Sequence, residues 1–197
     1  MLAVAAGSEQ LTRAMESLEA SFLIGVDGVT EIWLVRHADC YRDLTTPEDP
    51  PLSALGRQQA ARLAERVRRV RHAAVYSSPY RRATETARAI TNEVTQDRRL
   101  VEMELEVGED GAFNFIEDTD AVIARMRAAV DEIATEHTGH RVVVVSHAAA
   151  IIAYLADALK LGPGQLRALP YYTSVSIVRV LGDRRTVSTI GDVAHLE

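Results

Sequence analysis

The stretch Arg141-Val-Val-Val-Val-Ser146 places four consecutive valines between two polar residues, directly after the turn-forming pair Thr138-Gly139. A strand that is apolar at every position is typical of a parallel sheet covered on both faces. Residues 148–161 then have helical character and end at Gly162-Pro-Gly164. This stretch therefore predicts a central strand of an α/β sheet, followed by a helix that packs on one of its faces.

Outward from this strand, short apolar runs alternate with amphipathic segments in both directions. The patterns predict strands over 31–36, 73–77 and 98–101, helices over 53–69, 79–94 and 120–137, and a hairpin of 174–180 with 185–190. Between 102 and 118 lies a glycine- and acid-rich segment. The alternation predicts a three-layer α/β/α fold with a mostly parallel central sheet and helices on both faces.

Residues 8–24 precede this alternation, and their large apolar side chains recur at helical spacing behind Ser8, a suitable N-cap. These side chains are Leu11, Met15, Leu18 and Phe22. We therefore predict an N-terminal helical appendage over residues 1–28 and a single domain over 29–197. The helix either packs on its own domain or forms a homo-oligomer contact through residues 8–24, and the sequence leaves both readings open.

Composition narrows the classes of function. The chain has 197 residues, 28 acidic and 22 basic, with a net charge of −6. An acidic balance disfavours nucleic acid as a partner. The single cysteine, Cys40, excludes an intrachain disulfide and a cysteine-cluster metal site, and we expect no cofactor. No apolar run reaches the roughly 18 residues of a membrane span, and the start lacks a basic signal-peptide region, so we expect no membrane contact and a cytoplasmic protein.

In open α/β sheets, ligands bind outside the carboxyl ends of the strands. Here the strand ends carry Arg36-His37, the segment 77–82 with Arg81 and Arg82, and Ser146-His147. Arginine forks and helix N-termini bind phosphate. A neutral imidazole can attack phosphorus, a protonated second imidazole can stabilise the transition state, and a carboxylic acid can protonate the leaving oxygen. The pattern therefore favours phosphoryl transfer.

Four segments in order resemble motifs of the histidine phosphatase superfamily, whose members are phosphoglycerate mutase-like. They are Leu34-Val-Arg-His-Ala-Asp-Cys40, Leu52-Ser-Ala-Leu-Gly-Arg-Gln-Gln-Ala60, Tyr76-Ser-Ser-Pro-Tyr-Arg-Arg-Ala-Thr-Glu-Thr-Ala87 and Val145-Ser-His-Ala148. The resemblance implies a phosphoglycerate mutase-like fold. It also implies a metal-independent histidine phosphatase that works through a phosphohistidine.

Carried over by position, the resemblance makes His37 the phosphorylated nucleophile. It assigns Arg36, Arg82 and His147 to the phosphate pocket, with His147 also catalytic, and it places Arg81 on an exposed face. Leu100-Val-Glu102 resembles the family element that carries the proton donor, which makes Glu102 the candidate acid. Other carboxylates compete for that role: Asp39, Glu104, Glu106 and Glu109.

The sequence departs from the family pattern at a few positions. Ala38 and Ala148 stand where the family has glycine, and an added methyl crowds the pocket or restricts the backbone. Asp43 stands where several relatives have an asparagine that contacts phosphate, and a carboxylate there would repel it. We expect specificity to come from segments 43–51 and 102–118.

The expected activity is hydrolysis of a small phosphorylated metabolite. A bisphosphoglycerate-dependent mutase is the alternative, disfavoured because residues 102–110 are acidic and would repel a second anion. A catalytically weak phosphate-binding or scaffold protein is the third reading, motivated by the two alanines. Two further interpretations are weaker. A metal site at His137 and His140 lacks a third ligand. The arginines over 57–71 could form a nucleic-acid-binding stripe, but their pattern is better explained as the solvated face of a helix.

Overall fold

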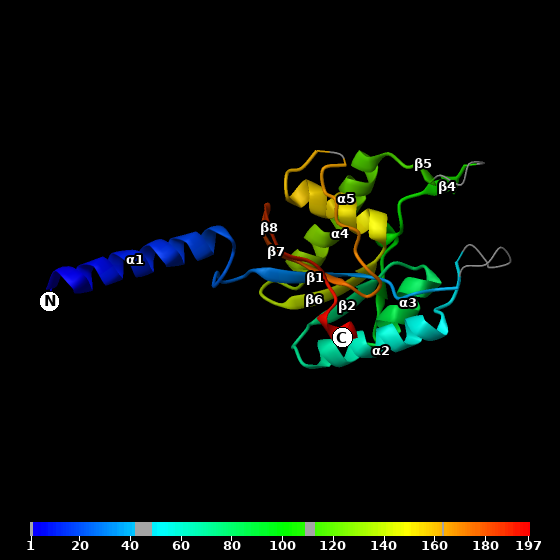
Figure 1. Ribbon diagram of the computed structural model, residues 1–197, viewed down its shortest axis with the longest axis horizontal. Helices are drawn as coiled ribbons and strands as arrows, with labels where there is room; N and C mark the ends of the chain where they lie inside the picture. The colour runs from blue at the N-terminus through cyan, green and yellow to red at the C-terminus, as the bar shows by residue number, and fades with distance from the viewer. Residues whose placement is uncertain (1, 42–48, 109–112, 163) are drawn as a thin grey trace.

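The computed structural model describes residues 2–41, 49–108, 113–162 and 164–197. Most of the chain forms a sheet with packed helices, and one long helix, α1 (Leu2–Ser21), projects away from them (Figure 1). The strands in the described ranges that form the main sheet are β1 (Thr30–Arg36), β2 (Ala74–Ser77), β3 (Thr95–Gln96), β6 (Arg141–Ser146), β7 (Val175–Leu181) and β8 (Arg184–Asp192).

The sheet has the strand order β3-β2-β6-β1-β7-β8. Strands β3, β2, β6 and β1 run parallel, whereas β7 and β8 run antiparallel to their neighbours and form the edge hairpin. The valine strand β6 lies between β2 and β1, and all four valines are fully buried. The predicted mostly parallel sheet, with a hairpin at its edge, is confirmed.

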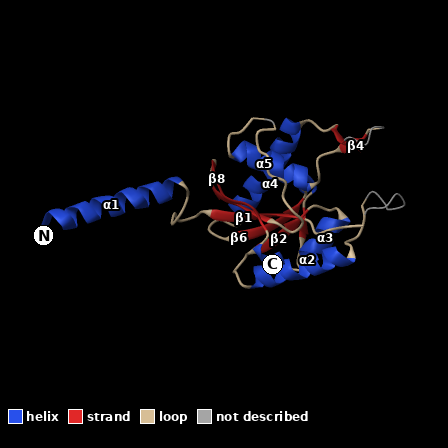
Figure 2. Cartoon of the chain, in the orientation of Figure 1, coloured by secondary structure: helices blue, strands red, loops and turns tan. Residues whose placement is uncertain are grey.

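Helices cover both faces of this sheet (Figure 2). One face packs against α4 (Thr119–Glu136) and α5 (Ala148–Ala158), and the other against α2 (Ala54–Arg68) and α3 (Arg81–Arg88). Alternate residues of β1 serve the two cores: Leu34 joins the α4–α5 side, whereas Trp33 joins the α2–α3 side. This is the predicted three-layer α/β/α architecture.

Some predicted boundaries are wrong. Residues 98–101 were expected to form a strand, but Arg98–Leu100 is a 3-10 turn, because the Asp97 carboxylate accepts from Arg99 N at 2.8 Å and starts a turn there. The helix expected over 79–94 ends at Arg88, and the one expected over 148–161 ends at Ala158. The acid-rich segment contains a short hairpin of β4 (Leu105–Val107) and β5 (Phe113–Phe115).

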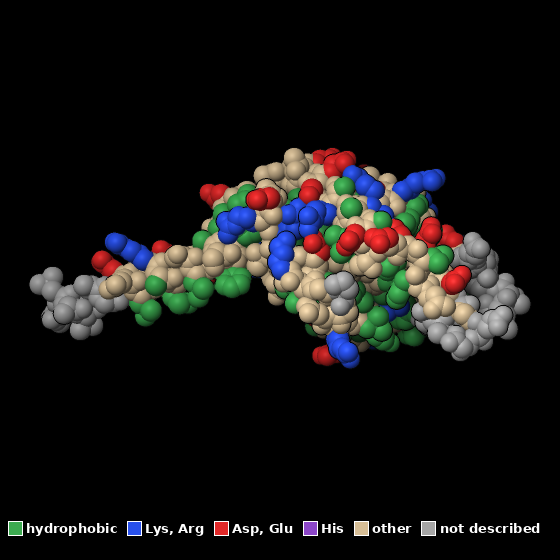
Figure 3. Space-filling model, turned by 90° about the horizontal axis from the view of Figure 1, so that it is seen from above, with side chains coloured by type: hydrophobic (Ala, Val, Ile, Leu, Met, Phe, Trp, Pro, Cys, Tyr) green, Lys and Arg blue, Asp and Glu red, His purple; other side chains and the backbone are tan. Residues whose placement is uncertain are grey.

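The N-terminal helix is longer than predicted. It begins at Leu2, so Ser8 lies inside it and is not its N-cap. Its end is tied to the body by Arg184, whose Nη2 donates to the carbonyls of Ala20 and Ser21. Hydrophobic side chains lie in a row along one side of the projecting helix (Figure 3). In the described part of the chain, none of the helices has the length and apolar character that crossing a bilayer requires.

Candidate active site

Strand register brings the two candidate histidines together. Strands β1 and β6 pair in parallel with Arg36 opposite Ser146, so His37 and His147 follow at the same level of the sheet. His37 N donates to Ser146 O at 3.0 Å, and the two ring centroids are 5.1 Å apart. Two residues far apart in sequence thus meet at the carboxyl edge of the sheet, where the sequence places the ligand site.

The backbone fixes the tautomer of His37. The ring is 6% exposed, and its Nδ1 lies 2.8 Å from the carbonyl oxygen of Ala38. A carbonyl only accepts, so Nδ1 carries the proton and donates. In the neutral ring the lone pair therefore resides on Nε2. This is the form in which an imidazole can act as a nucleophile.

His147 is fully buried at the N-terminus of α5, and its Nε2 lies 2.9 Å from Ser78 Oγ. Its Nδ1 has no hydrogen-bond partner among the described residues. Burial, together with the charge of His37 and of nearby arginines, holds the pKa of His147 well below its usual value. In the protein without a ligand, this shift opposes the protonated form of the second imidazole that the sequence analysis invokes. A bound dianion would act in the opposite direction and favour the protonated ring.

Two arginines flank the histidines, each stacked on a tyrosine. The guanidinium of Arg36 lies 4.0 Å from the ring centroid of Tyr172 and donates to Pro170 O at 2.8 Å. Arg82 lies 4.8 Å from the ring centroid of Tyr80, and its Nη1 is 3.5 Å from Asp49 Oδ1. The stacking restricts where each guanidinium can point.

The tyrosine rings also contact the histidines. Tyr172 lies 5.7 Å from the His37 ring, and Tyr80 lies 5.2 Å from the His147 ring, centroid to centroid. Each tyrosine thus contacts one histidine and one arginine. Both imidazoles and both guanidiniums belong to one connected cluster.

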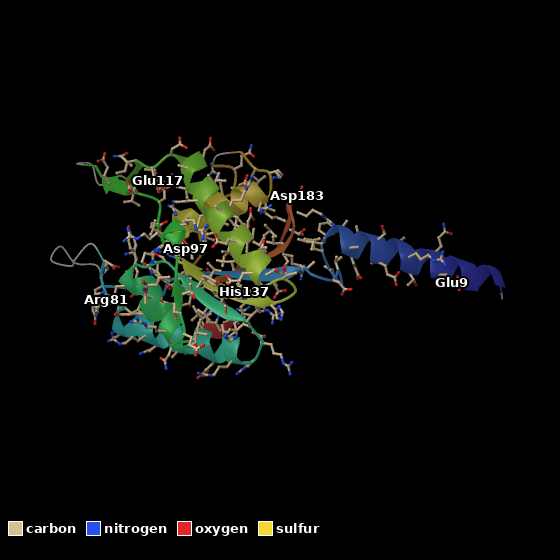
Figure 4. All side chains as sticks on the ribbon, turned by 180° about the vertical axis from the view of Figure 1, so that it is seen from behind. Glu9, Arg81, Asp97, Glu117, His137 and Asp183 are labelled. Carbon is tan, nitrogen blue, oxygen red and sulfur yellow. The ribbon has the colours of Figure 1, made fainter. Side chains whose placement is uncertain are left out.

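Arg81 lies apart from this cluster, at the outer edge of α3 (Figure 4). Its side chain is 59% exposed and pairs with Glu85. The prediction that Arg82, and not Arg81, faces the site agrees with this geometry.

The segment around Ala38 is held by the second and third motifs. Ala38 is fully buried, and its N–H donates to Thr86 Oγ1 of α3 at 2.9 Å. The next N–H, of Asp39, donates to Gln59 Oε1 of α2 at 2.9 Å. A Cβ at Gly56 would lie 1.9 Å from the carbonyl oxygen of Asp39, so only glycine permits this approach. These motifs therefore position the loop that carries His37.

Glu102 is fixed at the N-terminus of α5. Its Oε1 accepts from Met103 N and Ala150 N, each at 3.0 Å, and its Oε2 accepts from Ala149 N at 3.4 Å. Ala149 and Ala150 lie in the helical turn that follows His147. The carboxyl group is therefore attached to the same turn as the second histidine.

The competing carboxylates have other surroundings. Glu104 and Glu106 are exposed, and Asp39 accepts a hydrogen bond from Ser53 Oγ at 2.5 Å. Glu109 lies outside the described residues, as do Asp43 and most of the segment 43–51. Among the described candidates, Glu102 alone is anchored to the turn that follows His147.

Ser78, Tyr80 and Tyr172 belong to the cluster and were not predicted. Ser78 and Tyr80 lie within the third quoted motif, where their position offered a signal. Tyr172 precedes β7, and because β7 runs antiparallel to β1, its start lies at the carboxyl edge of the sheet. Only the strand pairing brings this residue to the site.

The two weaker readings find no support in these contacts. Tyr76 Oη lies 3.1 Å from His137 Nε2, and Thr138 O lies 2.9 Å from His140 Nδ1, so both rings already have hydrogen-bond partners within the protein. Within the described residues, no group of three metal-ligating side chains occurs. In the arginine stripe, Arg66 is paired with Asp192.

The sequence matches the family model of the histidine phosphatase superfamily (branch 1) over residues 32–114 and 107–193. The chain belongs to the histidine phosphatase superfamily. The four motifs of the sequence all lie within the matched residues.

Relatives in this superfamily cover most of the chain. Phosphoglycerate mutase-like protein 4 of Arabidopsis thaliana is 30% identical over 85% of this chain and 87% of its own length. The metal-independent phosphoserine phosphatase of Arabidopsis thaliana is 28% identical, over 85% and 84%. Among solved structures, YhfR of Bacillus stearothermophilus has a TM-score of 0.73 and 30% identity, covering 85% of this chain and all of that one. The phosphoglycerate mutase-like fold is thus confirmed.

Proposed function

We propose that the protein is a metal-independent phosphomonoester hydrolase that acts on a small phosphorylated metabolite through a phosphohistidine. One observation carries this proposal: two buried imidazoles lie 5.1 Å apart between Arg36 and Arg82, with the tautomer of His37 set by a backbone carbonyl. Membership in the superfamily and the likeness to a metal-independent phosphoserine phosphatase support it.

The first step transfers the phosphoryl group to the protein. Nε2 of His37 forms a bond to phosphorus while the bond from phosphorus to the leaving oxygen breaks. Glu102, in its protonated form, gives its proton to that oxygen, so an alcohol leaves. The products of this step are the alcohol, phospho-His37 and the Glu102 carboxylate.

The second step returns the protein to its initial state. Water attacks phosphorus as the bond to Nε2 breaks, and Glu102 accepts the proton of the water. Inorganic phosphate then leaves. In both steps Arg36, Arg82 and His147 stabilise charge on the phosphoryl oxygens.

A phosphoglycerate mutase is the second candidate, because relatives named as probable phosphoglycerate mutases are similar to this chain. Such an enzyme must hold a second anionic group of its substrate. The described residues beyond Glu102 include the exposed carboxylates Glu104 and Glu106, which oppose a second anion. Hydrolysis is therefore the better-supported reaction.

The third interpretation, a catalytically weak phosphate-binding protein, is disfavoured because both histidines and both arginines of the cluster are in place.

The function is tested by a phosphatase screen in the presence of EDTA. We expect phosphate release from some members of a panel of sugar phosphates, phospho-acids and nucleotides, and from p-nitrophenyl phosphate. In parallel, 3-phosphoglycerate with 2,3-bisphosphoglycerate should yield no 2-phosphoglycerate. Formation of 2-phosphoglycerate would favour the mutase. Binding of vanadate with neither activity would favour the binding protein.

We further propose that residues 29–197 are a single domain and that residues 1–28 are an appendage that forms contacts between subunits of a homo-oligomer. The large apolar residues along α1 and directly after it, namely Leu11, Met15, Leu18 and Phe22, are 48–65% exposed. Helices in proteins are stabilised mostly by packing of an apolar face, and a spacing of three and four residues is that of a coiled-coil seam.

Deleting residues 1–28 is expected to reduce the mass in solution to that of one chain while phosphatase activity is retained. Light scattering after gel filtration measures the mass. In the full chain, Leu11→Glu with Leu18→Glu should have the same effect, whereas Gln10→Glu with Ser17→Glu adds equal charge off the apolar row and should not. A full-length chain that is already a monomer would contradict this proposal.

A further inference from the structure

The segment that carries Glu102 is held by its backbone. Four successive carbonyl groups, from Arg99 to Glu102, each accept a side-chain hydrogen bond. Ser146 Oγ, next to His147, donates to Leu100 O at 2.8 Å. The other three carbonyls accept from a single residue, Arg125 of α4.

Arg125 uses its whole guanidinium for this purpose. Nη1 donates to Arg99 O and Val101 O, each at 2.8 Å, and Nη2 donates to Glu102 O at 3.1 Å. The side chain is only 17% exposed. A planar fork with five donors can bind several acceptors at once, which the ammonium of lysine cannot reproduce.

Glu117 holds the guanidinium from the other side. Its two oxygens accept from Nε at 2.8 Å and from Nη2 at 2.9 Å, which makes the pair bidentate. Glu117 Oε2 also accepts from Glu104 N at 3.1 Å, so it reaches the chain just beyond Glu102. The hydrogen bonds of Arg125 hold the pKa of Glu117 below its usual value. Glu117 lies by the β4–β5 hairpin, away from α2 and α3 on the opposite face of the sheet (Figure 4).

We propose that Arg125, oriented by Glu117, is a positioning residue that sets the place of the Glu102 carboxyl group. The inference rests on the proposed function, because it assumes that Glu102 protonates the leaving oxygen. Glu102 is then fixed at both ends: its backbone by Arg125, and its carboxyl group by the amides of Met103, Ala149 and Ala150.

This arrangement predicts which step and which substrates are slowed when Arg125 is lost. In the first step, a displaced Glu102 slows formation of phospho-His37 only where the leaving oxygen needs a proton. In the second step, which is common to all substrates, it slows the attack of water equally. The attack of His37 depends on other contacts, those to Ala38 and Ser146, and is expected to persist. Loss of Arg125 therefore slows the formation of phospho-His37 most for substrates with poor leaving groups.

The test is Arg125→Met, which removes every donor and keeps the apolar stem of the side chain. We expect the rate of formation of phospho-His37, measured by rapid quench, to fall about 10- to 100-fold for an alkyl phosphate and less than about 3-fold for p-nitrophenyl phosphate. Across a series of aryl phosphates, the logarithm of this rate should depend more steeply on the pKa of the leaving group. Arg125→Lys should recover only part of the loss, and Glu117→Gln should give a smaller change of the same pattern.

A double variant separates positioning from a general structural role. Combined with Glu102→Gln, Arg125→Met should cost nothing further for the alkyl phosphate, since the group that it positions is already lost. Arg127→Met is the matched control, because Arg127 lies on the same helix and pairs instead with Asp157 of α5. It should leave the dependence on leaving group unchanged.

Equal slowing of phospho-His37 formation for both substrates, or a fully additive double variant, would overturn the positioning role. If Arg125→Met does not fold, Glu117→Gln decides the question by the same comparison. Failure of the proposed function has a different signature: phosphatase activity of the unsubstituted protein would be absent or independent of His37.

Discussion

The His37→Ala variant is expected to lose phosphatase activity by roughly 10⁴-fold or more, for good and poor leaving groups alike. The nucleophile is the one group that no neighbour replaces: the other imidazole of the cluster, His147, is fully buried and its Nε2 is engaged with Ser78. Initial rates with p-nitrophenyl phosphate and with an alkyl phosphate measure the loss. Circular dichroism and thermal unfolding establish that the variant is folded.

His140→Ala provides the control for this substitution. His140 precedes β6 at the opposite edge of the sheet, where its Nδ1 lies 2.9 Å from Thr138 O. Removing this ring should leave kcat unchanged. Substantial activity in His37→Ala would show that another group attacks phosphorus.

The second large effect is expected from Glu102→Gln. Glutamine keeps the shape of the side chain but cannot donate the proton that an alkoxide needs. General acid catalysis contributes about 10²- to 10⁴-fold, so we expect a loss of that size for an alkyl phosphate. For p-nitrophenyl phosphate, whose leaving group scarcely needs a proton, formation of phospho-His37 should be almost unaffected.

Glu104→Gln is the matched control, since Glu104 lies two residues further along and its side chain is exposed. It should retain activity toward both substrates. If Glu102→Gln slowed formation of the phosphoenzyme equally for both, the proton donor would be another residue.

The sequence predicts the parts of the site that follow buried strands. The valine run from 141 to 146 identifies the central strand, and the residues after it and after β1 become neighbours because the two strands pair in parallel. Arg36, His37 and His147 could therefore be found from local pattern and position. The capping serine of α2, Ser53, was likewise predictable, because the N-cap interaction is local.

The parts that were missed depend on contacts distant in sequence. Tyr172 reaches Arg36 only through the antiparallel pairing of β7 with β1. Arg125, in the middle of a helix, has nothing in its neighbouring residues that indicates contact with the segment 99–102. The lowered pKa of His147 results chiefly from burial, which the sequence does not reveal.

The central claim, that phosphate passes through His37, is tested most directly by trapping the phosphoenzyme. The protein is mixed with a ³²P-labelled substrate, quenched within milliseconds in denaturant, and analysed for bound label at acid and alkaline pH. We predict label on His37 that is lost in acid and stable in alkali, and that is absent from His37→Ala but present in His140→Ala. Label that survives acid, label on another residue, or turnover without any labelled protein would contradict the account.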